Sequence, residues 1–139
     1  MGNDTQYKSL KNKIIIITGG SQGIGKSMVE EFVKQKSIVH FLDIDKLGAK
    51  SLIESLSSYD NHPCFHECDI KNIDKLKTIV NSIGNENNRI DVLINNAAND
   101  QRHKIEEVDQ KFWQDRIDIN LSHSFFATQA AIPFLKRSD

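Results

Sequence analysis

The sequence predicts one α/β domain over residues 1–139, built on a doubly wound parallel sheet with the strand order 3-2-1-4. Short β-type segments alternate with longer segments of helical periodicity, which is the pattern of βαβ units. The block Ile14–Ile17 is β-branched without polar alternation, as expected for a central strand covered on both faces. A glycine-rich turn follows this block and opens a helix, and the crevice beside such a turn is where open α/β sheets bind ligands.

The four strands are expected where short apolar runs are bounded by polar or glycine-containing segments. They cover Ile14–Ile17, Ile38–Leu42, about Pro63–Cys68, and Val92–Ile94. Right-handed crossovers between parallel strands then give the order stated above.

The helices between these strands are expected from apolar residues at three- and four-residue intervals. The first carries Ile24, Met28 and Phe32 beside Val29 and Val33; the second begins at an N-cap, Asp45, and carries Leu52, Ile53 and Leu56; the third carries Ile73, Leu76, Val80 and Ile83. A polar loop is expected over residues 84–89.

A long amphipathic helix is expected from Asp109 onward. Its broad apolar face would be formed by Phe112, Trp113, Ile117, Leu121 and Phe125. Pro133 is expected to kink or end it, because proline removes a helical hydrogen bond.

Composition narrows the classes of partner. Lys and Arg number 18 against 19 Asp and Glu, so the formal charge is -1 and nucleic acid is not expected as a partner. The longest apolar run, Ile14–Ile17, is too short to cross a bilayer, and the segment Met1–Asp4 lacks the features of a secretion signal. We therefore expect a cytoplasmic protein that does not enter membranes.

Cys64 and Cys68 flank His66, but a fourth metal ligand is missing nearby, so no metal site is expected.

The glycine-rich turn predicts a phosphate-binding site. Glycines allow the backbone to approach a ligand closely, and free N–H groups at the start of a helix attract an anion. The turn and the start of the helix comprise Thr18, Gly19, Gly20, Ser21, Gln22, Gly23, Ile24 and Gly25.

Two nucleotide classes compete for this turn. Gly20, four further residues and then Gly25-Lys26-Ser27 also satisfy the phosphate loop of nucleoside triphosphatases. Asp43 favours a dinucleotide instead, because it lies 18 residues after Gly25 at the end of the next strand, where a carboxylate binds an adenosine ribose.

Four separated motifs occur in an order that resembles the short-chain dehydrogenase/reductase family, which has the Rossmann fold. They are Thr18-Gly19 with Gly23 and Gly25, Asp43, Asp69-Ile70, and Asn95-Asn96-Ala97-Ala98, with Ala98 where the family usually has glycine. The resemblance implies NAD as cofactor. It implies a binding site made of Thr18, Gly19, Ser21, Gln22, Gly23, Ile24, Gly25, Asp43, Asp69, Ile70, Asn95, Ala97 and Ala98. Asp43 favours NAD over NADP, because a 2′-phosphate would meet like charge.

The resemblance also implies a catalytic role for Asn120. The segment 99–103, with Glu106 and Glu107, is similar to the aldose dehydrogenase branch that contains xylose and rhamnose dehydrogenases, which implies a sugar substrate for the full-length form.

The family's serine and its Tyr-x-x-x-Lys motif should follow Asn120, yet the tyrosines here are Tyr7 and Tyr59. We therefore expect a C-terminally truncated oxidoreductase with little or no turnover of its own. The alternative is a non-catalytic dinucleotide-binding or oligomerising module, in which an exposed strand edge and the long helix favour a homo-oligomer.

Overall fold

The four strands of the computed structural model form one parallel sheet in the order β3-β2-β1-β4, which confirms the predicted topology. We describe residues 5–138; the features read from Met1–Asp4 lie outside this range. The strands are β1 (Ile14–Thr18), β2 (Ile38–Asp43), β3 (Cys64–Glu67) and β4 (Val92–Ile94). Ile15 of β1 pairs with Val39 of β2 on one side and with Val92 of β4 on the other.

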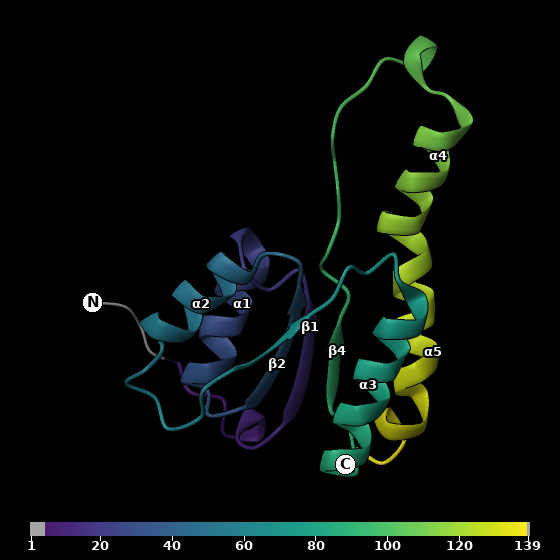
Figure 1. The fold of residues 1–139 in the computed structure, drawn as a ribbon. Coiled ribbons are helices and arrows are strands. Elements are labelled where there is room, and N and C mark those ends of the chain that lie inside the picture. The colour runs from purple at the N-terminus through teal and green to yellow at the C-terminus, as the bar shows by residue number, and fades with distance from the viewer. Residues whose placement is uncertain (1–4, 139) are drawn as a thin grey trace.

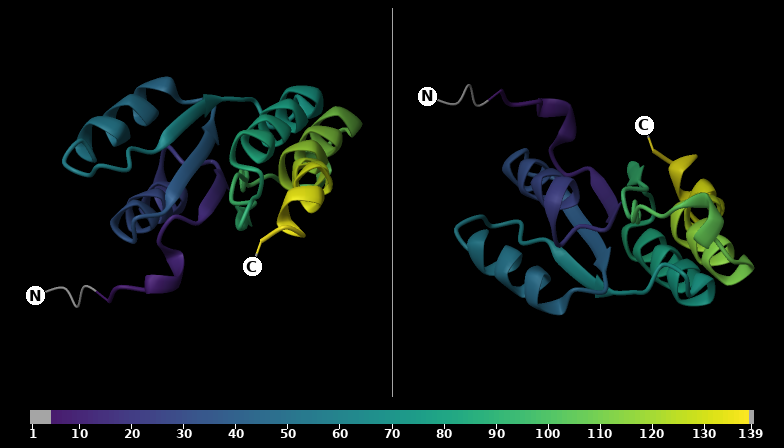
Figure 2. Two further views of the ribbon diagram at one scale, coloured as in Figure 1. Left: turned by 90° about the horizontal axis from the view of Figure 1, so that it is seen from below. Right: turned by 90° about the horizontal axis from the view of Figure 1, so that it is seen from above.

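Helices cover both faces of the sheet. One pair, α1 (Gly23–Lys34) and α2 (Lys46–Ser55), lies on one face, and α3 (Ile73–Asn87) with α5 (His123–Leu135) lies on the other (Figures 1 and 2). The helix α4 (Gln110–Ile117) extends beyond the end of the sheet (Figure 1). Short 3-10 turns occupy η1 (Lys8–Leu10) and η2 (Ile105–Glu107). Within residues 5–138, no helix has the length and apolar character needed to cross a membrane.

The isoleucine block of β1 serves two cores. Ile14 and Ile16 pack with the α3 and α5 side chains, whereas Ile15 and Ile17 pack with those of α1 and α2. Successive side chains of a strand point to opposite faces, so a strand with a core on each face is apolar at every position.

The buried face of α1 differs from the predicted one. Val29 and Val33 are fully buried together with Gly25, whereas Ile24 is 75% exposed and Met28 and Phe32 only border the core. The positions 25, 29 and 33 share one face of the helix, and Gly25 lets that face approach the glycine-rich turn.

The long helix expected from Asp109 onward is confirmed, with one π-helical turn inside it. Asp109 caps α4 by accepting a hydrogen bond from the Phe112 N–H at 2.7 Å, and a π-helical turn, η3 (Asp118–Ser122), joins α4 directly to α5. Pro133 does not end α5, which continues to Leu135.

The buried face of this helical region is also different from the one expected. Trp113, Leu121 and Phe125 are each about 60% exposed, and α5 instead buries Ala127, Ala130, Ala131 and Phe134. Small side chains let α5 lie close to α3, which explains why the larger residues face outward.

The expected loop at residues 84–89 is also wrong, because α3 continues to Asn87. Gly84 is buried in the helix against the Phe134 ring. A Cβ added at Gly84 would lie 2.4 Å from Cδ2 of that ring, so glycine permits the contact between α3 and α5.

Helix propensity and packing therefore predict opposite effects for Gly84→Ala. We expect the packing conflict to prevail and the free energy of unfolding to fall by about 1–3 kcal/mol. Asn85→Ala, at the neighbouring exposed position, should leave stability unchanged or raise it slightly. Urea denaturation of both variants measures this, and a stabilised Gly84→Ala would contradict the packing argument.

A pair of histidines connects β2 with β3. His40 Nδ1 and His66 Nε2 are 3.0 Å apart, and the side chain of His40 is 6% exposed. Burial, together with the charge on His66, lowers the pKa of His40 to about 4, against a smaller opposing effect of Glu86. Burial also lowers the pKa of His66.

Because His40 is held neutral in the fold, its contribution to stability is complete above pH ~6.5 and is lost as the pH falls toward about 4. We expect the free energy of unfolding to drop by about 2 kcal/mol from pH 7 to pH 5. In His40→Leu this drop should shrink, whereas the exposed His62→Leu should retain it. Parallel slopes for all three proteins in urea denaturation would contradict this assignment.

Candidate functional site

A cleft of about 870 Å³ opens at the carboxyl ends of β1, β2 and β4, where the topology places a ligand. Its walls come from the glycine-rich turn, the end of β2, the segment after β3 and the segment after β4. Predicted site residues that line it are Gly19, Gln22, Gly23, Ile24, Gly25, Asp43, Asp69, Ile70, Ala97 and Ala98. These ten residues therefore share one cleft, and their role in cofactor binding stays a prediction.

The turn presents a helix start that no described side chain caps. Asp45, Asn72 and Asp109 cap α2, α3 and α4, whereas Gln22, which precedes α1, makes no capping hydrogen bond. The first N–H groups of a helix lack intrahelical partners and carry partial positive charge. This arrangement suits an anion such as a phosphate.

Close packing fixes the turn. Gly19 has a positive φ of 70°. A Cβ at Gly25 would lie 1.9 Å from the Gly19 carbonyl oxygen and 2.6 Å from Asn96 Nδ2. No larger residue fits at position 25, which accounts for glycine there.

Side-chain hydrogen bonds join the ends of β1 and β4. Thr18 Oγ1 accepts from the N–H groups of Asn96 and Ala97, both at 3.0 Å, and the Asn96 amide donates to the carbonyl oxygens of Thr18 and Gly19. Thr18 is fully buried and acts by holding the turn rather than by lining the cleft. Asn96 was not among the predicted site residues, although it lies inside the quoted Asn-Asn-Ala-Ala motif.

Asp43 stands at the mouth of the turn. One carboxylate oxygen accepts from the Ser21 N–H at 2.9 Å, and the other accepts from the N–H groups of Ile44 and Asp45 at 2.8 and 3.1 Å. A carboxylate offers about four lone-pair sites. These three hydrogen bonds leave Asp43 able to accept one more, on the oxygen that faces Ser21. Ser21 itself is buried and contributes only its backbone N–H to this network.

The segment after β3 forms the far wall. Asp69 accepts a hydrogen bond from the Lys71 N–H at 3.0 Å, which shapes the loop that carries Ile70 into the cleft. Lys71 also lines the cleft, and its ammonium pairs with Asp115 of α4 at 3.0 Å.

Besides Thr18 and Ser21, two further predicted residues do not line the cleft. Asn95 turns toward α5, where its amide donates to Thr128 Oγ1 at 3.2 Å, so it braces the helix and does not line the cleft. Asn120 lies in η3 and clamps the backbone of Asn99, accepting from its N–H at 2.8 Å and donating to its carbonyl at 3.1 Å. Asn99 itself lines the cleft. Hydrogen bonds between an asparagine side chain and a backbone 21 residues away, as between Asn120 and Asn99, have no signal in the sequence.

The triphosphatase alternative requires Lys26 to reach a phosphate. Its ammonium instead pairs with Glu30 one turn further along α1, at 3.9 Å, and Lys26 is not among the residues that line the cleft. The structure therefore favours the dinucleotide interpretation of the turn.

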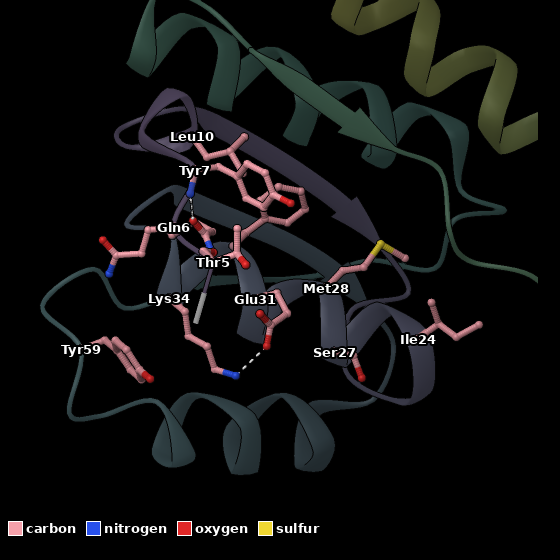
Figure 3. A pocket seen from close by; sticks show the side chains of 12 residues that line it. Thr5, Gln6, Tyr7, Leu10, Ile24, Ser27, Met28, Glu31, Lys34 and Tyr59 are labelled. Atoms are coloured by element: carbon pink, nitrogen blue, oxygen red, sulfur yellow. Dashed lines mark hydrogen bonds and ion pairs between the residues drawn. The ribbon is translucent and has the colours of Figure 1, made fainter. Parts of the chain in front are cut away.

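A second hollow, of about 770 Å³, lies between α1 and the N-terminal segment (Figure 3). Tyr7 and Met28 contribute to its wall, as does the ion pair between Glu31 and Lys34. Ile24, which is largely exposed, borders both hollows.

A family model described as short chain dehydrogenase matches residues 13–139. The chain belongs to this family. Its relatives include the D-xylose 1-dehydrogenase of Caulobacter vibrioides, which is 40% identical over 131 residues, covering 94% of this chain and 51% of that protein. The chain thus spans about half the length of the curated relatives it matches.

Solved structures agree with the family assignment. The ligand-free aldohexose dehydrogenase of Thermoplasma acidophilum matches with a TM-score of 0.80 and 33% identity, over 95% of this chain and 48% of that one. An NADH-dependent reductase complexed with NAD matches with a TM-score of 0.84 and 29% identity, over 94% of this chain and 55% of the reductase.

The hydrogen bonds of Thr18 predict a stability effect. Thr18→Val retains the shape but leaves the N–H groups of Asn96 and Ala97 without their acceptor, so we expect a loss of about 1–3 kcal/mol in the free energy of unfolding. Thr18→Ser keeps the hydroxyl and should lose less. Thermal denaturation would refute the role of the hydroxyl if serine were the more damaging replacement.

Proposed function

We propose that this chain is the dinucleotide-binding part of an NAD-preferring dehydrogenase that acts on a sugar. The observation that carries the proposal is the position of the Asp43 carboxylate, 2.9 Å from the Ser21 N–H at the edge of the turn. A phosphate site and a ribose site thereby lie side by side in one cleft.

The described residues fit a dinucleotide. The uncapped start of α1 suits the pyrophosphate, and the remaining acceptor site on Asp43 suits a ribose hydroxyl. Asp69 and Ile70 would border the adenine, and Thr18 and Asn96 hold the turn in place. When bound, the nicotinamide supplies the hydride acceptor.

The charge at the cleft supports NAD over NADP. A 2′-phosphate on a ribose held by Asp43 would meet a carboxylate, and Gln22 brings no cation to the turn. Sugar as the substrate class rests on the relatives, a D-xylose 1-dehydrogenase and an aldohexose dehydrogenase, and on the similarity of the segment 99–103 to the aldose branch. In the whole protein, Asn120 would act at the same cleft through the backbone of Asn99.

Association between copies is part of the proposal. Trp113, Leu121 and Phe125 are apolar side chains that α4, η3 and α5 leave about 60% exposed. Exposed aromatic and aliphatic side chains of this size favour self-association, which static light scattering would detect. A monomer at high concentration would argue against the homo-oligomer.

Calorimetric titration of the 139-residue chain tests the cofactor assignment. We expect NAD to bind at least about tenfold more tightly than NADP, and Asp43→Asn to weaken NAD binding by about tenfold, because a charge-assisted hydrogen bond is lost. Asp60→Asn changes the same charge at an exposed position away from the cleft and should have no effect. Equal affinity for the two nucleotides would reject NAD preference.

A further inference from the structure

A second carboxylate, that of Asp45, is fixed at the same edge of the cleft. One of its oxygens accepts from the Gly48 N–H at 2.9 Å, and the other accepts from the side-chain amide of Gln22. Gln22 is the residue directly before α1, and Asp45 is the N-cap of α2. The Asp45 carboxylate therefore bridges the starts of two helices, and both Gln22 and Asp45 line the cleft.

Gly48 makes room for this bridge. A Cβ at position 48 would lie 2.4 Å from Asp45 Oδ2 and 3.3 Å from Ser21 Cβ, so any side chain there would push the carboxylate away from the turn. The Gly48 N–H and the Gln22 amide lower the pKa of Asp45. The carboxylate is thus ionised at neutral pH as well as held in one place.

Asp43 and Asp45 are directly linked, because Asp43 Oδ1 accepts the backbone N–H of Asp45 at 3.1 Å. Nearby cations are engaged elsewhere. Lys71 is the one lysine or arginine among the described residues lining the cleft, and it pairs with Asp115. Lys46, next to Asp45 in sequence, pairs with Glu67 at 2.9 Å. A dianionic group at this edge would meet two negative charges with no free counter-cation from these lysines.

We infer that Asp45 is a second determinant of cofactor choice, which excludes the 2′-phosphate independently of Asp43. The inference rests on the proposed function, since it concerns the same adenosine site. Neutralising Asp43 alone leaves Asp45 opposing the phosphate. Admission of a 2′-phosphate then requires the neutralisation of both carboxylates.

The test uses two nucleotides that differ only at the ribose 2′ position, 5′-AMP and 2′,5′-ADP, titrated into the 139-residue chain by calorimetry. The variants are Asp43→Asn, Asp45→Asn and the double variant. Asparagine is as good an N-cap as aspartate, so Asp45→Asn removes the charge and keeps the cap of α2. Asp109→Asn, at the N-cap of α4, is the matched control for charge and capping.

We expect Asp43→Asn alone to raise the affinity for 2′,5′-ADP by less than about threefold, and the double variant to raise it by at least about tenfold more. Asp45→Asn should leave 5′-AMP affinity within about twofold, and Asp109→Asn should alter neither nucleotide. Asp45→Ser, another good N-cap, should reproduce the effect of Asp45→Asn, and melting curves show whether each variant is folded.

Two results would overturn the role of Asp45 while leaving NAD preference intact: an unchanged 2′,5′-ADP affinity when Asp45→Asn is added to Asp43→Asn, or an equal change for both nucleotides. A wild-type chain that binds 2′,5′-ADP as tightly as 5′-AMP, or binds neither, would instead reject the proposed function and this inference with it.

Discussion

The cleft depends on the hydrogen bonds that hold the end of β1 to the segment after β4. Beyond Thr18 and Ile94 the strand ladder stops, and side chains take over the pairing: the Thr18 hydroxyl accepts two N–H groups and the Asn96 amide donates to two carbonyl groups. Buried backbone groups left unpaired there would be costly. The same bonds that satisfy them fix the glycine-rich turn before any ligand arrives, so binding need not order it.

Opposite electrostatic features lie along this fixed frame. The start of α1 offers N–H groups with partial positive charge, and the end of β2 offers the carboxylate of Asp43. A dinucleotide has the complementary order, with phosphates beside a neutral, hydroxyl-bearing ribose. A nucleoside triphosphate has the same order, but its terminal phosphate needs the lysine of the phosphate loop, and here Lys26 pairs with Glu30.

Features determined by local sequence were predictable, and features determined by tertiary contact were not. The strands, their order and the turn follow from apolar runs and glycine spacing, which depend on neighbouring residues. The face that α1 buries, which leaves Ile24 exposed, is set by how closely Gly25 approaches the glycine-rich turn. The extension of α3 through Gly84 depends on a ring more than forty residues away, and a glycine followed by polar residues favours a loop by propensity alone. Asn96 was not predicted as a site residue, because the Asn-Asn-Ala-Ala motif alone does not show which of its residues holds the turn.

On the proposed function, the acidic edge formed by Asp43 and Asp45 would discriminate between NAD and NADP without a dedicated contact to the rejected cofactor. Asp43 and Asp45 both carry a negative charge, and each accepts hydrogen bonds from neutral donors: three backbone N–H groups for Asp43, and the Gly48 N–H with the Gln22 amide for Asp45. The Gly48 N–H and the Gln22 amide lower the pKa of Asp45 without cancelling its negative charge, whereas a lysine would cancel it. Selectivity is a difference between two affinities. A carboxylate that accepts hydrogen bonds from amides can still accept a ribose hydroxyl and repel a phosphate, so in the proposed site one arrangement would serve both recognition and exclusion.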